Sequence, residues 1–221
     1  MSQPDWTSST LAELAESKAL VFSDGYRTRA DQFASEGIPI LRAADVADGI
    51  LIPAHSDHIR TDFRPKIGNK TTRARDVVLT TKGTVGRAAM VPDGFPEHAY
   101  SPQLCFFRVK DTATLDAGYL YGWIRSTECR SQLFASKDLT DMAPYVNLRD
   151  LSQFRITLPP LSEQWRIAGV LSAFDDLIET NRNLACSQEA LARVLASRGD
   201  DEVAVEEIAE VPPRRQRRPT G

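Results

Sequence analysis

The most regular hydrophobic pattern in this chain lies between residues 159 and 199. Pro159 and Pro160 cannot lie inside a helix, and Ser162 behind them is a natural N-terminal cap. The apolar residues that follow recur at helical spacing, which predicts one long amphipathic helix that ends at Gly199. At about 1.5 Å per residue this helix would be roughly 55 Å long, which is more than an ordinary domain can cover.

The same hydrophobic stripe can be divided into heptads, in which two positions of every seven face a partner helix. One position holds Ile167, Phe174, Asn181, Gln188 and Leu195, and the other holds Val170, Leu177, Leu184 and Leu191. Asn181 and Gln188 are the polar members, and polar residues in such a seam fix the register and the number of helices. We therefore predict that these residues form a dimerisation seam. The open alternative is a helix that packs on its own domain and leaves Asn181 exposed.

Shorter patterns upstream predict a domain of mixed secondary structure. Strands are predicted over 38–41, 77–81, 88–91, 104–109 and 154–158, and helices over 10–16 and 114–136. Loops are predicted over 53–72, 82–86 and 137–147, and residues 1–9 are predicted to be disordered. The predicted fold class is therefore α/β (α+β), with one mixed-sheet domain followed by a long coiled-coil-forming helix.

Several of these segments carry the motifs of a known family. Residues 158–184, LPPLSEQWRIAGVLSAFDDLIETNRNL, resemble the conserved region of type I restriction-modification specificity subunits, in which Pro-Pro-Leu-x-Glu-Gln and Arg-Ile begin a spacer helix. Residues 76–92, with a Lys-Gly-Thr-x-Gly turn between two strands, and residues 147–160 resemble this family as well. Trp165 departs from the pattern, because a second Arg is common there. The resemblance extends over roughly residues 10–199.

The resemblance implies a half-length specificity subunit (S subunit), because full-length members have two target recognition domains and two spacer helices. Residues 10–17 are similar to residues 204–211, as if a second module started there. The predicted domains are a disordered N-terminus at 1–9, a target recognition domain at 10–158, a spacer and dimerisation helix at 159–199, and an acidic then Arg-rich tail of a truncated module at 200–221. Such a chain would restore the two-domain arrangement as an antiparallel homodimer.

The resemblance also implies the partners of this chain. They would be double-stranded DNA, a second copy of the chain, a DNA adenine methyltransferase subunit and a restriction/translocase subunit, in a cytoplasmic phage-defence system. The chain itself would be non-catalytic and bind no cofactor, whereas the partner subunits would use S-adenosylmethionine, ATP and Mg. Because two identical modules read the same bases twice, the target would be an interrupted palindrome.

Charge gives only partial support for DNA binding. The net charge is −3 at pH 7, which is not typical of a DNA-binding protein. Between residues 58 and 90, however, eight Lys and Arg residues stand against two acidic ones, while acidic residues collect between 200 and 210. One basic face on an otherwise acidic protein would explain this distribution, and a solvated mixed surface would explain it equally well.

The candidate DNA contacts are residues whose side chains can bind phosphates or base edges. They are Lys82, Thr84 and Arg87 at the 82–86 turn, Lys66, Lys70 and Arg73 in the preceding loop, Ser101 and Gln103 between two strands, and Tyr145. Gly83 and Gly86 would let the backbone of the turn approach DNA closely. The open alternatives are an ordinary hairpin tip, a solvated loop, polar turn residues and a surface-packed tyrosine.

Other classes of protein have little support in the sequence. No apolar run reaches the roughly 18 residues of a membrane span, and three separated cysteines fit a reducing compartment better than a disulfide framework. Nucleotide-binding and methyltransferase motifs are absent, and His55 with His58 is more typical of a polar loop than of a metal site. The remaining alternative is a protein–protein adaptor that uses the long helix and binds no specific DNA; a stand-alone nuclease or methyltransferase is not favoured.

Overall fold

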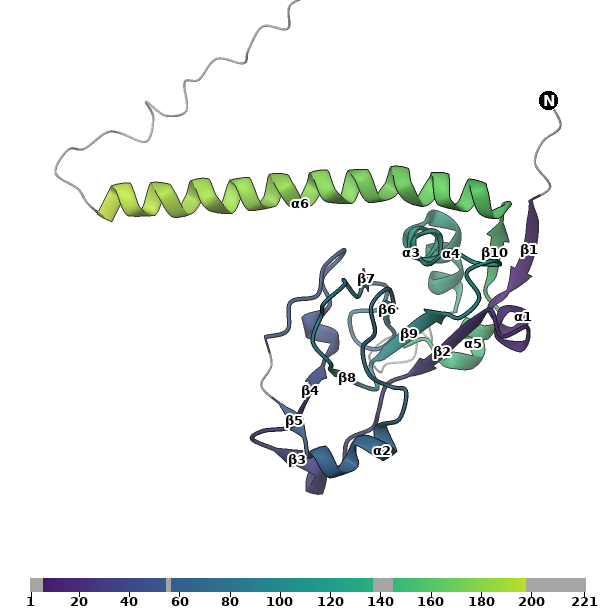
Figure 1. The fold of residues 1–221 in the computed structure, drawn as a ribbon, viewed down its shortest axis with the longest axis horizontal. Helices are drawn as coiled ribbons and strands as arrows, with labels where there is room; N and C mark the ends of the chain where they lie inside the picture. Colours follow the sequence, from purple (N-terminus) through teal and green to yellow (C-terminus); the bar gives the residue numbers. More distant parts are fainter. Residues whose placement is uncertain (1–5, 55–56, 137–144, 198–221) are drawn as a thin grey trace, which may run out of the picture. The chain divides into compact units, whose positions relative to one another are not determined.

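The computed structural model describes residues 6–54, 57–136 and 145–197, in two compact units that divide between Asp175 and Asp176. The elements of the first unit are β1 Thr7–Thr10, α1 Leu11–Glu16, β2 Leu20–Asp24, β3 Phe33–Ala34, β4 Ile38–Leu41, β5 His58–Ile59, α2 Arg64–Ile67, β6 Val77–Thr80, β7 Ala88–Met90, β8 Ala99–Tyr100, β9 Leu104–Val109, α3 Ala117–Arg125, α4 Thr127–Ala135, α5 Leu148–Ser152 and β10 Arg155–Leu158 (Figure 1). Helix α6, Leu161–Ser197, begins in the first unit and continues in the second. None of the described helices is long and apolar enough to cross a membrane.

Three small sheets make up the strand structure of the first unit. The central sheet has the strand order β2-β9-β6-β7 and is antiparallel throughout. A second sheet has the order β3-β5-β4-β8, in which β4 and β8 run parallel. Strands β1 and β10 form an antiparallel ribbon that brings the start of the chain next to the strand leading into α6. The predicted mixed α/β class is confirmed.

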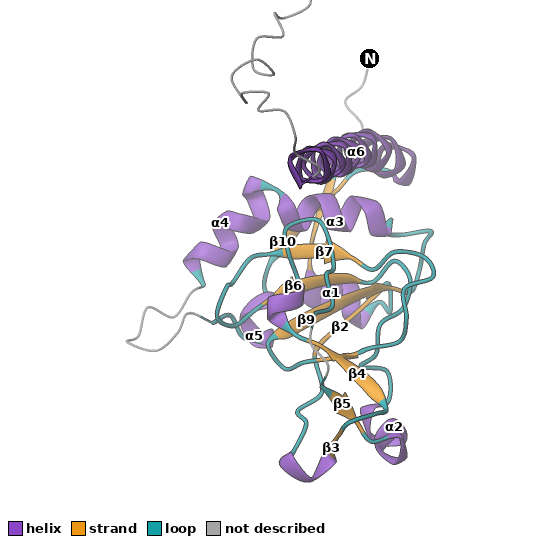
Figure 2. Cartoon of the chain, turned by 90° about the vertical axis from the view of Figure 1, so that its left-hand side faces the viewer, coloured by secondary structure: helices purple, strands orange, loops and turns teal. Residues whose placement is uncertain are grey.

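The inner strands β6 and β9 of the central sheet are buried on both faces, which is why they carry apolar residues at successive positions rather than at alternate ones. Val77 and Leu79 point to one face, where α1, α3, α4 and α5 contribute the surrounding core residues. Val78 and Phe106 point to the other face and pack near Leu41 of β4. Figure 2 shows α3 and α4 on one side of this sheet and β4 on the other.

The strands predicted over 38–41, 77–81, 88–91, 104–109 and 154–158 are all present within one residue of their predicted ends. The predicted helix at 10–16 is also confirmed. Its cap is a reciprocal pair: Thr10 Oγ1 accepts the Glu13 N–H at 3.1 Å, and the Glu13 carboxylate accepts the Thr10 N–H at 2.7 Å. Residues 1–5, 137–144 and 198–221, which include most of a predicted loop and the predicted tail, lie outside the described residues.

Two predictions for the first half of the chain are wrong. Residues 7–9, predicted to be disordered, belong to β1, whose hydrogen bonds with β10 join segments far apart in the sequence. The segment 53–72, predicted to be an exposed loop, contains β5 and α2, and its Thr71 and Thr72 are buried. Its Gly68 does lie in the predicted turn, with a φ of +62°.

The helix predicted over 114–136 consists of two helices. Ser126 is extended and caps α4, with its side chain accepting the Cys129 N–H at 3.3 Å. The cap of α3 is Asp116, whose carboxylate accepts the Tyr119 N–H at 2.9 Å, so this helix begins after residue 114. Between Ile124 and Leu133 only Cys129 is apolar, and the rough period of the whole segment did not reveal the bend.

The long helix begins at Leu161, one residue before the predicted cap Ser162. A buried glutamine fixes this start to the domain. The Gln164 side chain accepts the Asp116 N–H at 2.9 Å and donates to the carbonyls of Thr114 at 3.2 Å and Pro159 at 3.0 Å. The glutamine of the Pro-Pro-Leu-x-Glu-Gln motif is therefore a structural residue that joins α6 to the segment before α3.

Two glycines of α3 allow the first turns of α6 to approach closely. A Cβ atom at Gly118 would lie 3.0 Å from the Ala168 Cβ, and one at Gly122 would lie 2.5 Å from a Leu171 methyl group. Arg125 at the end of α3 adds an ion pair with Asp175, at 2.5 Å. These contacts hold the first four turns of α6 within the first unit.

Candidate nucleic-acid interface

The turn between β6 and β7, residues 81–87, is organised by the buried hydroxyl of Thr80. This hydroxyl donates to the Thr84 carbonyl and accepts the Arg87 N–H at 3.0 Å. Gly83 and Gly86 have φ values of +77° and +101°, which residues with a Cβ rarely adopt. The turn therefore has a defined backbone, although Thr84 and Arg87 at its surface are exposed.

Two other predicted DNA contacts lie beside this turn. Tyr145 forms an isolated antiparallel bridge with Lys82, and the Val146 N–H donates to the Thr81 carbonyl at 2.9 Å. The backbone N–H and the hydroxyl of Thr81 both donate to the Gln103 carbonyl, at 2.9 and 3.1 Å. Candidates from three separate segments are therefore brought together at one end of β6.

The cations of the turn are available for an external partner. Lys82 and Arg87 are exposed, and neither has an ion-pair partner among the residues that the structure describes. Unpaired surface cations are what phosphate binding requires, since a cation already held by a carboxylate must first break that contact.

Sequence reasoning missed one wall of this surface. A groove of about 230 Å³ lies between the turn and α4, lined by Val85, Gly86, Arg87, Arg130, Leu133 and Phe134. Leu133 and Phe134 lie in the helix predicted over 114–136, in which no DNA contact was predicted. Leu133 is buried, but Phe134 is 67% exposed. The signal was present in the sequence, because adjacent residues of a helix point about 100° apart and cannot both face a narrow core contact.

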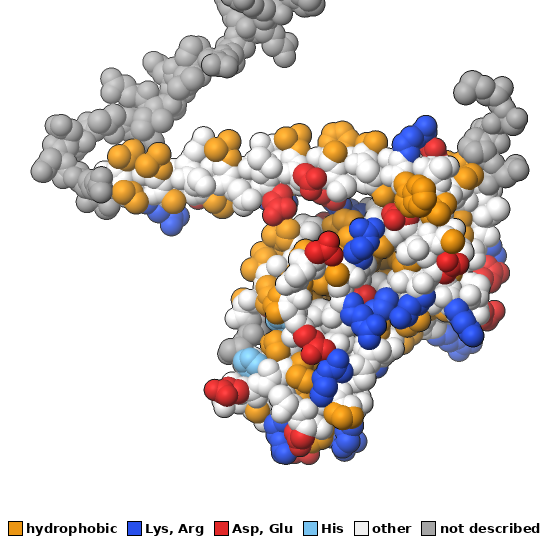
Figure 3. All heavy atoms as spheres, viewed as in Figure 1, with side chains coloured by type: hydrophobic (Ala, Val, Ile, Leu, Met, Phe, Trp, Pro, Cys, Tyr) orange, Lys and Arg blue, Asp and Glu red, His pale blue; other side chains and the backbone are white. Residues whose placement is uncertain are grey.

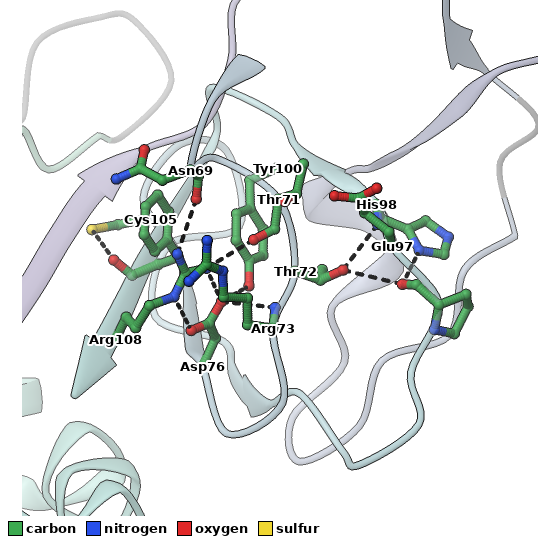
Figure 4. A network of polar contacts seen from close by, with 12 residues as sticks. Asn69, Thr71, Thr72, Arg73, Asp76, Glu97, His98, Tyr100, Cys105 and Arg108 are labelled. Carbon is green, nitrogen blue, oxygen red and sulfur yellow. Dashed lines mark hydrogen bonds and ion pairs between the residues drawn. The ribbon is translucent and has the colours of Figure 1, made fainter. Parts of the chain in front are cut away.

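At the other end of β6 lies the segment 64–76, which contains α2 and the residues between α2 and β6. It is called the 64–76 loop, and a buried ion pair anchors it (Figure 4). The Asp76 carboxylate accepts hydrogen bonds from Nε and Nη2 of Arg108, at 2.7 and 2.6 Å. It also accepts one from the Tyr100 hydroxyl, at 2.7 Å. Arg108 in turn donates to the carbonyls of Asn69 at 3.1 Å and Thr71 at 2.8 Å. The guanidinium thus ties the backbone of the loop to β9.

Arg108 and Tyr100 each keep one protonation state at neutral pH. Burial opposes the charge on Arg108, but the ion pair and hydrogen bonds with Asp76 outweigh it and raise the pKa of Arg108. Burial, and then the neighbouring carboxylate of Asp76, raise the pKa of the Tyr100 hydroxyl. At neutral pH the guanidinium therefore stays charged and the tyrosine stays protonated, so the anchor persists.

The predicted DNA contacts in the 64–76 loop differ in whether their side chains are already bound within the domain. Lys70 Nζ is bound to the Asp24 carboxylate at 2.9 Å and to the Gly25 carbonyl at 3.1 Å, so it has a structural role. Lys66 Nζ lies 4.9 Å from the centre of the Phe63 ring, and Arg73 is exposed with no ion-pair partner among the described residues.

Ser101 is a poor DNA contact in this conformation. It is 2% exposed, and its buried hydroxyl has no hydrogen-bond partner among the described residues, so it cannot reach a base edge.

Among the described residues, no group of His, Cys, Asp and Glu could hold a metal ion.

Helix α6 presents the second candidate surface. The seam residues Val170, Phe174, Leu177, Leu184, Leu191 and Leu195 are between 55% and 61% exposed. Ile167 is the exception, because it packs against the core of the first unit. Figure 3 shows hydrophobic side chains along most of the length of the helix. Exposed apolar stripes of this length are typical of surfaces that bind another molecule.

These features define a class of protein: a mixed α/β domain with an unpaired cationic turn, continued by a long amphipathic helix. Residues 3–186 match the model of the family described as "Type I restriction modification DNA specificity domain", and the chain therefore belongs to this family. The predicted family is confirmed. No curated protein matches the chain.

Solved structures with this fold come from the same kind of system. One is described as "Structural basis underlying complex assembly and conformational transition of the type I R-M system", with 21% identity, a TM-score of 0.61, and coverage of 88% of this chain and 44% of that chain. The type I S subunit from M. genitalium has 18% identity and a TM-score of 0.58, covering 83% and 42%. The HsdS subunit from Thermoanaerobacter tengcongensis has 21% identity and a TM-score of 0.56, covering 94% and 44%. The chain thus spans less than half the length of each.

Proposed function

We propose that this chain reads DNA for a type I restriction-modification system and contributes no catalysis of its own. The observation that carries the proposal is the family match over residues 3–186. The 81–87 turn supports it, because Lys82 and Arg87 are exposed, have no ion-pair partner in the described part of the chain, and lie next to glycines that leave the backbone accessible. Partner subunits would supply the chemistry: an adenine methyltransferase with S-adenosylmethionine, and a restriction/translocase subunit with ATP and Mg.

The turn and its neighbours divide the work of recognition. Lys82 and Arg87 would bind backbone phosphates or a guanine edge, and Gln103 would accept from and donate to an adenine edge. Thr84 and Tyr145 would fix the register through phosphate contacts. Lys66 and Arg73, beyond the other end of β6, would add phosphate contacts on the flank of the site.

Helix α6 would pair with the α6 of a second copy, in the antiparallel sense. A suitable register faces Phe174 with Leu191, Asn181 with Leu184, and Gln188 with Leu177 of the partner. This register uses only exposed seam residues and leaves Ile167 in its own core. The arrangement is compatible with a two-fold axis, so one surface serves both copies.

The apolar arc of α6 is wider than a two-helix seam. Ile178 flanks the seam and is 45% exposed, whereas Leu171 on the same flank is 39% exposed and lies partly against α3 at Gly122. A two-helix pair would leave Ile178 partly in water, and a further helix would cover it. We assign this flank to the methyltransferase subunit that the chain would recruit.

The target that follows is an interrupted palindrome. Two identical modules would read two inverted half-sites, and the roughly 55 Å of helix between them exceeds the ~34 Å of one DNA turn. The bases between the half-sites would therefore not be read.

Methylation mapping tests the proposed function. The chain is expressed with its cognate methyltransferase subunit, and N6-methyladenine is mapped across the host DNA. We expect methylation at one interrupted palindrome. A single asymmetric motif would contradict the symmetric dimer, and an absence of methylation together with no salt-dependent DNA binding would favour an adaptor over a DNA reader.

Sedimentation tests the pairing of α6 separately. We expect the chain to be a dimer that Leu184→Asp converts to a folded monomer, because Leu184 lies on the seam and is exposed within its own chain, so that the charge disturbs no contact of the domain. The matched control is Ala190→Asp, which adds the same charge to an exposed position outside the seam. A wild-type chain that stays monomeric at high concentration would overturn the pairing.

A further inference from the structure

We propose that the second half of α4 forms the opposite wall of the DNA-binding surface and binds the sugar-phosphate backbone through Arg130 and Phe134. The inference rests on the proposed DNA-reading function and extends it to a helix that carries none of the sequence-predicted contacts. Its basis is the groove of about 230 Å³ in which Arg87 of the turn and Arg130 of α4 line the same space.

The groove combines the two chemistries that a DNA backbone presents. Guanidinium groups can bind a phosphate through two parallel hydrogen bonds, and two arginines are among the residues that line this space. Val85, Leu133 and Phe134 supply apolar surface against which a deoxyribose ring can pack. A small uncharged ligand would leave the charge of Arg87 unused, and an apolar peptide would bury it without a counter-charge. The charge of the lining therefore favours an anionic chain with an apolar ring in its repeat.

The position of the groove also favours a DNA backbone. The Arg87 backbone N–H bonds to the Thr80 hydroxyl at 3.0 Å, so one wall is continuous with the organised turn. Lys82 lies in the same turn and is exposed. A strand that contacts Lys82 and Arg87 would therefore continue along α4 without a break.

One acidic group limits the charge of the groove. Asp48 Oδ2 lies 3.5 Å from Arg130 Nη2, and both side chains are about half exposed, at 57% and 49%. A pair this long and exposed is weak. A phosphate can therefore displace Asp48, and the removal of Asp48 frees Arg130 for DNA.

The test measures binding to a fixed duplex of mixed sequence, roughly 30 base pairs or three helical turns long, as a function of salt. For Arg130→Gln we expect weaker binding and a salt slope that falls by about 0.9, the loss of one phosphate contact. For Phe134→Ala we expect weaker binding with an unchanged slope. For Asp48→Asn we expect tighter binding, a change that a purely structural role of α4 does not produce.

Two matched controls lie away from the groove. Lys110→Gln removes an exposed cation that lies just past the C-terminal end of β9. This end of β9 is the one farther from the turn, because Leu104 at the other end pairs with Thr80. Phe33→Ala removes an exposed aromatic side chain of β3. Both variants should bind as wild type does, and melting temperatures check that every variant is folded.

The outcomes separate this inference from the proposed function. If Lys82→Ala/Arg87→Ala weakens DNA binding while Arg130→Gln, Phe134→Ala and Asp48→Asn bind as the wild type does, the proposed role of α4 is wrong and the proposed DNA-reading function stands. If the wild-type chain itself binds no duplex at low salt, both are overturned.

Discussion

The two basic segments at the ends of β6 look alike in the sequence but differ in what their cations do. In the 64–76 loop, Arg64, Lys70 and Arg75 each pair with an acidic residue of the same domain. In the 81–87 turn, Lys82 and Arg87 have no such partner among the described residues. A local count of charge therefore overstates the cationic surface of the loop and describes that of the turn correctly. Substitutions in the loop and in the turn test this difference separately.

The largest effect is expected at the buried anchor of the loop. Arg108→Met leaves Asp76 buried without its counter-charge and should lower the free energy of unfolding by roughly 3–5 kcal/mol. Denaturant unfolding measures this loss. The control is Arg108→Met/Asp76→Leu, which removes both charges and should recover part of the stability, since the Tyr100 hydroxyl and the carbonyls of Asn69 and Thr71 still lose their partners. Equal instability of the single and double variants would show that the ion pair is not the source of the effect.

A large effect on DNA binding is expected at the turn. Lys82→Ala/Arg87→Ala should weaken duplex binding and lower the salt slope by about 1.8, because two phosphate contacts are lost. A fluorescence titration at several salt concentrations measures both quantities. An unchanged slope would mean that the cations of the turn do not contact phosphates, and the comparison between the two segments would fail.

A smaller effect on stability is expected at Thr80. Thr80→Val keeps the shape of the side chain but leaves the Arg87 N–H and the Thr84 carbonyl without their partner, at a cost of about 1–3 kcal/mol. DNA affinity should fall as well, because the turn loses its organised backbone. Thr180→Val is the control, since its exposed hydroxyl bonds only within α6, to the Asp176 carbonyl. Wild-type affinity in Thr80→Val would show that the turn orders itself without the hydroxyl.

The smallest effect is expected at Lys70. Its partner Asp24 is half exposed, so Lys70→Ala should cost less than about 1 kcal/mol of stability and leave the salt slope of DNA binding unchanged. The same titration measures the slope. A slope that falls by about 0.9 would place Lys70 on the DNA and remove the distinction between loop and turn.

Local signals in the sequence predicted most of the elements but few of their long-range relations. Alternation and apolar runs located β4, β6, β7, β9 and β10, and the pattern over 10–16 located α1, whose start the structure shows to be fixed by the box of Thr10 and Glu13. The strand β1 was missed because its polar sequence is strand-like only through pairing with β10. The break at Ser126 was missed because both helices around it bury apolar residues in the same core.

The sequence by itself determined the family and the long helix with its exposed seam, because helical period and a motif of adjacent residues are local properties. Only the tertiary structure decided which charged residues are free. It paired Lys70 with Asp24, buried Ser101, and placed Gln103 and Tyr145 beside Lys82. The physical reason is that ion pairs, burial and neighbourhood across strands depend on distances between residues far apart in the chain, which no local pattern encodes.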